Sequence, residues 1–111
     1  MSVRMSSAWQ KLSALEVAGV GGYMGVYEVC TLDGEVVRVG YAGGQSRFGL
    51  RGELASQLER YGENCALMRV EITSSYLSRY QELVAVHLHD HGRMPRDNDD
   101  DPSRFGVVTP N

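Results

Sequence analysis

The sequence predicts an α+β domain in which a small three-stranded antiparallel sheet is flanked by helices. Two short apolar runs enclose Asp33-Gly34, and an Asp-Gly pair in this setting is the strongest short-range signal for a β-hairpin. A third run with alternating polarity lies between two segments of helical periodicity. The chain has 111 residues, of which 42% are apolar, which suffices for one modest core and leaves no room for a second domain.

The N-terminal part is expected to be helical. Ser7 is a plausible N-cap for a short helix over 8–19, which would end at Gly19. The apolar stripe of this helix would consist of Trp9, Leu12, Leu15 and Val17. We therefore divide the chain into an N-terminal helical segment (1–19), a main domain (20–98) and an acidic polar tail (99–111).

The central hairpin is expected to pair a strand over 23–31 with a strand over 35–41. Gly43 and Gly44 then open a loop that continues to Gly49. A helix follows, closed by Gly62 as a C′ glycine, and its apolar positions are Leu50, Leu54 and Leu58.

The third strand is predicted over 66–73, where Arg69 and Glu71 alternate with Met68, Val70 and Ile72. A long helix comes next, capped by Ser74 or Ser75 and terminated by Gly92. Its expected apolar stripe consists of Leu77, Tyr80, Val84 and Leu88.

Charge is distributed unevenly along the chain, whose net charge is −3. Residues 97–111 contain four aspartates against Arg104, which leaves ten charges of each sign in residues 1–96, and ten of the eleven basic residues are arginine. No apolar run is long enough to span a membrane. The N-terminus lacks the features of a secretory signal, and Cys30 and Cys65 form no disulfide framework, so a cytoplasmic location is expected.

Two short motifs occupy the two strands of the hairpin: "GVY" at 25–27 and "RVG" at 38–40. In their order and spacing they resemble the signature of the GIY-YIG nuclease superfamily, in a divergent form confined to one small domain. Arg51 in the next helix, Glu82 in the last helix and "PRDN" at 95–98 mirror further positions of that family. The resemblance covers 25–98.

The resemblance implies a metal-dependent endonuclease that hydrolyses phosphodiester bonds in DNA, and less readily in RNA. Tyr27 would position or deprotonate the attacking water, and Arg51 would clamp the phosphate as charge develops. Glu82 would hold one Mg²⁺ or Mn²⁺ ion, which neutralises charge and stabilises the leaving oxygen. Asn98 would support this site, and Gly40 would keep the backbone low enough for a phosphate to approach.

Several positions depart from the family pattern. Arg38 stands in place of the second tyrosine of the signature, and Ala55 stands where many members carry His or Tyr, so that catalysis would either be rebuilt around Arg38 or be lost. Tyr41 replaces the lost hydroxyl only if the strand bends at Gly40, since in a regular strand it points to the opposite face from Arg38. Arg47 is an alternative to Arg51 as the phosphate-binding arginine.

The alternative hypothesis is therefore a catalytically inactive module that keeps the fold and binds nucleic acid or protein. The balanced charge of residues 1–96 offers little phosphate neutralisation, so a homodimer or a partner protein would have to add affinity. Glu82 is expected to be partly buried; otherwise it is an exposed glutamate paired with Arg79 or Arg38. The "HLHDHG" segment contains His87 and His91 at helical spacing, either as solvated helix-end residues or as part of a metal site.

Overall fold

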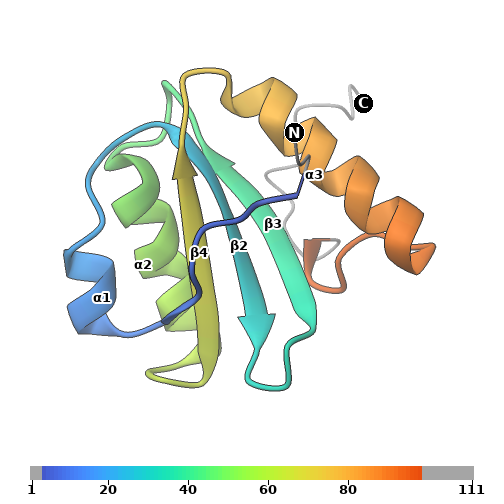
Figure 1. Ribbon diagram of the computed structural model, residues 1–111. Coiled ribbons are helices and arrows are strands. Elements are labelled where there is room, and N and C mark those ends of the chain that lie inside the picture. Colours follow the sequence, from blue (N-terminus) through green and yellow to red (C-terminus); the bar gives the residue numbers. More distant parts are fainter. Residues whose placement is uncertain (1–3, 99–111) are drawn as a thin grey trace, which may run out of the picture.

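Residues 4–98 are described by the computed structural model, which has a single four-stranded antiparallel sheet between helices (Figure 1). The strands lie in the order β1-β4-β2-β3. In sequence the elements are β1 (Gln10–Lys11), α1 (Ala14–Ala18), β2 (Gly25–Thr31), β3 (Val36–Ala42), α2 (Gly49–Tyr61), β4 (Ala66–Ile72) and α3 (Tyr76–His91). The predicted antiparallel α+β class is confirmed, whereas the prediction of three strands is wrong because β1 adds a fourth.

The extra strand comes from the segment that was expected to be helical. Gln10 and Lys11 pair with Met68 and Leu67, and so cover the outer edge of β4 with backbone hydrogen bonds. The helix is limited to Ala14–Ala18, and its N-cap is Ser13 instead of Ser7: the Ser13 hydroxyl accepts a hydrogen bond from the Glu16 amide. Pairing with the open edge of β4 thus prevails over local helix propensity.

The central hairpin forms where predicted. Gly34 has a φ of +97°, a conformation that favours glycine, and its N–H donates to the Thr31 carbonyl within the turn. Between β2 and β3, Tyr27 lies opposite Gly40 and Val29 lies opposite Arg38, with a register shift at the next residue. Tyr27 and Arg38 therefore share one face of the sheet.

The sheet separates two hydrophobic cores. The α2 face of the sheet packs against α1 and α2 through a cluster made of Leu12, Val17, Tyr27, Val29, Val37, Ala42, Leu50, Leu54, Ala66 and Met68. The α3 face packs against α3 and the N-terminal segment through Met5, Val26, Val39 and Leu83. In Figure 1 the N-terminal segment crosses in front of β4 and β2 on the way from α3 to α1.

Both long helices begin at the same end of the sheet. Because β3 and β4 are each antiparallel to β2, both strands end at the end of the sheet where β2 begins. Helices α2 and α3 start after the loops that follow these two strand ends, at the top of the molecule in Figure 1. As predicted, they end at Gly62 and Gly92, whose N–H groups donate to the carbonyls of Leu58 and Leu88.

The buried stripe of α3 differs from the predicted one. Leu83 and His87 are the buried residues of this helix, whereas Leu77 and Leu88 are exposed. Tyr80 and Val84 of the predicted stripe are partly buried and pack against the core of the α3 face, so the prediction is confirmed in part. Within residues 4–98, none of the helices is long and apolar enough to cross a membrane.

Candidate functional site

Tyr27, the predicted water-activating residue, is part of the core on the α2 face. It is 0% exposed, and its hydroxyl oxygen is also buried. Its ring lies over Gly40 on the neighbouring strand, where a Cβ would overlap the ring and the hydroxyl. Gly40 thus makes room for the Tyr27 side chain, so the space above this glycine is filled from within the protein.

Arg38, which stands in place of the family's second tyrosine, is only 1% exposed. Its Nη2 group donates a hydrogen bond of 2.9 Å to the carbonyl of Asp97, in the segment after α3. The Asp97 carboxylate in turn accepts a hydrogen bond from the Tyr61 hydroxyl of α2. Burial and the adjacent Asp97 carboxylate raise the pKa of Tyr61 to about 12. Arg38 therefore joins β3 to the segment that follows α3.

Asn98 has a comparable structural role at the outer edge of β3. Its Oδ1 atom accepts a hydrogen bond of 3.0 Å from the Val39 N–H, and its Nδ2 group donates one of 3.1 Å to the Val39 carbonyl. The side-chain amide thus takes the position that another strand would occupy. Asn98 is 1% exposed, and its Nδ2 group also lies 3.5 Å from the Tyr80 hydroxyl.

Tyr41 lies on the α3 face, as expected for a regular strand at this position. Its ring stacks on Tyr76 with a centroid separation of 5.7 Å and meets the ring of Tyr80 edge-on at 5.1 Å. Arg38 lies on the other face of the same strand. Tyr41 therefore does not supply a hydroxyl at the position where the family has its second tyrosine.

Glu82 is exposed on α3, so the expectation of partial burial is wrong. Its side chain is 56% exposed, and it pairs with Arg79 at 3.0 Å, as in the alternative stated above. The Arg79 guanidinium also binds Glu71 of β4 at 2.8 Å. Helix α3 covers the α3 face, whereas Tyr27 lies on the α2 face. The structure therefore places Glu82 and Tyr27 on opposite sides of the sheet.

The metal ion implied by the resemblance does not fit the surroundings of Glu82. A cation bound there would have to displace the Arg79 guanidinium, which is already held by two carboxylates. In the part of the chain that the structure covers, no group of three or more His, Cys, Asp or Glu side chains is arranged to hold a metal.

The two candidate phosphate-binding arginines, Arg47 and Arg51, lie on either side of the N-cap residue of α2 and are exposed. Neither forms an ion pair within residues 4–98. A cation in the first turn of a helix is unfavourable because of the helix dipole, and the first turn of α2 contains no acidic residue. Arg51 is thus exposed in the first turn of α2, where its charge does not stabilise the helix, and Arg47 is exposed just before the helix begins.

Two exposed aromatic residues flank these arginines, and sequence reasoning did not identify them. Tyr23 and Phe48 are each 58% exposed. The Tyr23 carbonyl accepts a hydrogen bond of 2.9 Å from the Leu50 amide, and the Arg47 guanidinium lies 5.7 Å from the centre of the Phe48 ring. The position of Phe48, next to an arginine in a glycine-rich loop, was the available signal. We call Tyr23, Arg47, Phe48 and Arg51 the arginine–aromatic patch.

The surface around the patch is hollowed in two places. A cavity of about 220 Å³ is lined by Arg47, Phe48, Gly49, Gly52, Glu53 and Ser56. A second cavity of about 260 Å³ is lined by Tyr41, Gly43, Gly44, Gln45, Ser46, Tyr76 and Leu77. The Ser46 hydroxyl accepts a hydrogen bond from the Gly43 amide and donates one to Glu53, so it holds the loop between the two cavities. The lining of the first cavity thus combines one cation, Arg47, with one carboxylate, Glu53, and the lining of the second carries no charged side chain among the described residues.

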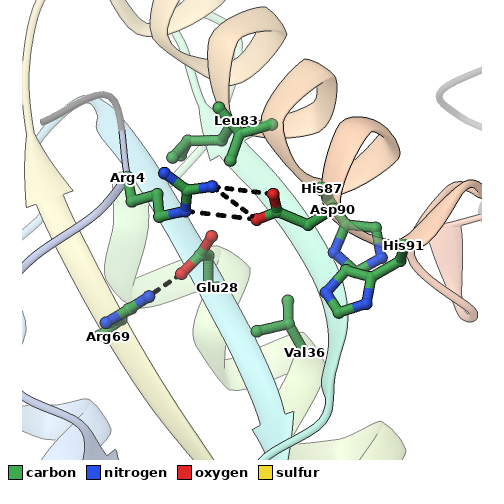
Figure 2. Close-up of a pocket in the computed structure, with 9 residues that line it drawn as sticks. Arg4, Glu28, Val36, Arg69, Leu83, His87, Asp90 and His91 are labelled. Atoms are coloured by element: carbon green, nitrogen blue, oxygen red, sulfur yellow. Dashed lines mark hydrogen bonds and ion pairs between the residues drawn. The ribbon is translucent and has the colours of Figure 1, made fainter.

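A separate polar cluster lies between the sheet and α3 (Figure 2). Glu28 of β2 is buried and pairs with Arg69 of β4, directly opposite, at 2.8 Å. Burial raises the pKa of Glu28 even though Arg69 opposes the shift. Above this pair, Arg4 binds Asp90 at 2.8 Å and so ties the N-terminal segment to α3. The cluster lines a pocket of about 100 Å³.

The histidines at the end of α3 are only partly solvated, contrary to the expectation for helix-end residues. His87 is buried, His91 is exposed, and their ring centres are 4.4 Å apart. Burial, together with the nearby charges of His91 and Arg93, lowers the pKa of His87. His87 is therefore a packing residue of α3 whose surroundings favour the neutral imidazole.

Comparison with curated proteins gave no match, and comparison with solved structures gave none either. Among protein families, the match extends over residues 1–90, from the N-terminal segment to nearly the end of α3. The chain therefore belongs to the family described as Domain of unknown function (DUF7508).

Proposed function

We propose that this protein is a nucleic-acid-binding module with a GIY-YIG-like fold that does not cleave its ligand. The observation that carries the proposal is the pair Arg47 and Arg51, which are exposed, four positions apart at the start of α2, and without an ion pair among the described residues. Guanidinium groups bind phosphate oxygens through two parallel hydrogen bonds, so two such groups at one helix start suit a phosphate backbone.

A GIY-YIG-like fold is supported by the order of the elements and by the positions of the motifs. The two motifs lie on the paired strands β2 and β3, and α2, β4 and α3 follow in that order. Absence of cleavage is supported by the burial of Tyr27 and Arg38 and by the pairing of Glu82 with Arg79. A water molecule and a phosphate need access to such groups before they can act.

Two arginines can neutralise only about two phosphates, so the proposal predicts a weak dependence of the binding constant on salt concentration. Each phosphate that is neutralised contributes about −0.7 to the slope of log K against log salt for a single strand and about −0.9 for a duplex. A single patch with Arg47 and Arg51 should therefore give a slope of roughly −1.4 to −1.8. A steeper slope would indicate that a second copy of the chain adds its own arginines, as a homodimer would.

The test compares matched arginine variants on native and heat-denatured plasmid DNA, with Mg²⁺ or Mn²⁺ present. Arg47→Gln and Arg51→Gln should each weaken binding and reduce the salt slope by about 0.7–0.9. Arg93→Gln is the control, because Arg93 is also exposed but lies at the far end of the molecule, where it pairs with Glu35. Equal binding by all three variants would overturn the proposed site. Nicking that disappears in Glu82→Ala would overturn the absence of cleavage and restore the endonuclease prediction.

A further inference from the structure

The exposure of Phe48 has no explanation in the stability of the fold. Phe48 occupies the N-cap position of α2 and makes no side-chain cap hydrogen bond. Ser, Thr, Asp or Asn would cap the helix at this position, and a phenylalanine that is 58% exposed contributes little to the core. The side chain at this position is therefore available for a ligand.

Tyr23 presents a second exposed ring close to the first turn of α2. Its backbone is fixed, because its carbonyl accepts a hydrogen bond from the Leu50 amide. Its ring lies over Gly21, where a Cβ would overlap ring carbons. The backbone of Gly22, next in the chain, lies against the Phe48 carbonyl, so the segments that present the two aromatic rings are adjacent. The two rings are thus carried by neighbouring backbone segments.

Apolar exposure is concentrated at this end of the molecule. Among residues 4–98, five of the eight large apolar residues that are exposed lie where β2 begins, β4 ends and the two long helices start: Tyr23, Met24, Phe48, Ile72 and Leu77. The other three, Leu15, Leu32 and Leu88, are distributed over three separate elements and loops. A surface that combines clustered apolar side chains with Arg47 and Arg51 matches a ligand that carries both flat apolar groups and negative charge.

We infer that the arginine–aromatic patch binds single-stranded nucleic acid, with bases stacked on Phe48 and Tyr23 and phosphates on Arg47 and Arg51. This inference rests on the proposed function and specifies its ligand. Unpaired bases can stack on exposed aromatic side chains, whereas the bases of a duplex are already stacked on one another. Because the patch has few cations, stacking must supply much of the affinity, and this favours single strands over duplexes.

The test uses three fluorescein-labelled DNA ligands with the same number of phosphates, about 12 nucleotides per strand. They are an oligothymidylate, an abasic strand and a hairpin duplex, and binding is followed by fluorescence anisotropy at low salt. The wild-type protein should bind the oligothymidylate more tightly than either of the other two. Phe48→Ala should weaken binding to the oligothymidylate by roughly 5-fold to 150-fold and leave binding to the abasic strand unchanged.

Two further variants separate stacking from folding and from charge. Phe48→Trp should retain binding, because tryptophan stacks at least as well, and Leu32→Ala is the matched control for loss of an exposed apolar side chain elsewhere. Equal binding of single strand and duplex, or an unchanged affinity in Phe48→Ala, would overturn the single-strand inference and leave the proposed function intact. Failure of the wild-type protein to bind any of the three ligands would overturn the proposed function itself.

Discussion

The α2 face and the arginine–aromatic patch contain the same residue types in opposite environments. Tyr27 and Arg38 on the α2 face are 0% and 1% exposed, whereas Tyr23 is 58% exposed and Arg51 is exposed without an ion pair among the described residues. The motif that resembles a nuclease signature contributes the buried pair, and the loop before α2 contributes Arg47 and Phe48 of the patch. A match of residue type to a motif therefore indicates the fold, while exposure and pairing indicate where a ligand can bind.

The two tyrosines provide the largest contrast. Tyr27→Ala removes a fully buried ring and leaves a cavity beside Gly40, and should lower the free energy of unfolding by about 3–5 kcal/mol. Tyr23→Ala should change it by less than about 0.5 kcal/mol, because the ring is mostly in solvent. Urea unfolding of both variants measures the difference. Similar losses of unfolding free energy in the two variants would contradict the contrast between a buried and an exposed tyrosine.

Asn98 tests whether the "PRDN" segment is structural. Asn98→Ala removes both hydrogen bonds to Val39 and should lower the free energy of unfolding by about 2 kcal/mol. The Val39 amide, which donates to the Asn98 side chain, should then exchange its hydrogen faster in a native-state exchange experiment. Unchanged exchange at Val39, together with lost nucleic-acid binding, would instead assign Asn98 to a ligand site.

The pH dependence separates stability from binding. The pKa of His87 is lowered in the folded protein, so the unfolded chain binds more protons and stability falls as the pH drops below about 6.5. Glu28 has the opposite effect, since its raised pKa means that its contribution to stability is lost as the pH increases from about 4.5 through the folded value. His87→Gln should remove the first dependence in thermal melts.

Binding should not follow this decline in stability as long as the protein stays folded, because arginine keeps its charge throughout this range. Anisotropy with the oligothymidylate between about pH 8 and 6 checks this expectation. A drop in affinity that parallels the titration of His87 would connect the ligand site to the α3 face and contradict the placement of the site at the start of α2.

The smallest expected change in the free energy of unfolding is that of an Arg51 variant, and it is an increase. Arg51→Glu should raise the free energy of unfolding by about 0.3–1 kcal/mol, because it replaces a cation by an anion at the N-terminus of a helix. The same change should abolish most phosphate binding. Thermal melting with parallel anisotropy measures both quantities, and a variant that loses stability as well as affinity would indicate that Arg51 has a structural role.

The sequence was sufficient for much of the fold because the local signals are strong. Asp33-Gly34 specified the hairpin, and Gly62 and Gly92 marked the ends of the two long helices. The strand at Gln10–Lys11 could not be predicted, because it forms only by pairing with β4, a contact between residues far apart in the chain. Tertiary pairing overrode the helical pattern that begins at Ser7.

The candidate site was harder to predict because the type of a residue does not tell whether its side chain is exposed in the folded protein. Tyr27 matched the motif, but only the structure shows that Gly40 makes room for its ring. Phe48 belongs to none of the motifs found in the sequence. Its exposure at an N-cap position becomes evident only once the start of α2 is known. Arg51 was identified from the resemblance to the nuclease family, and the structure leaves it exposed at the start of α2.

Backbone amide chemical shifts, recorded while a single-stranded oligonucleotide is added, test the central claim most directly. The largest changes are expected at Tyr23, Phe48, Arg51 and their neighbours in the chain. The amides of Tyr27 and Glu82 should move little, because one lies in the core of the α2 face and the other on a helix across the sheet. Changes centred on Tyr27 and Glu82 instead would contradict the account and place the ligand at the nuclease motif.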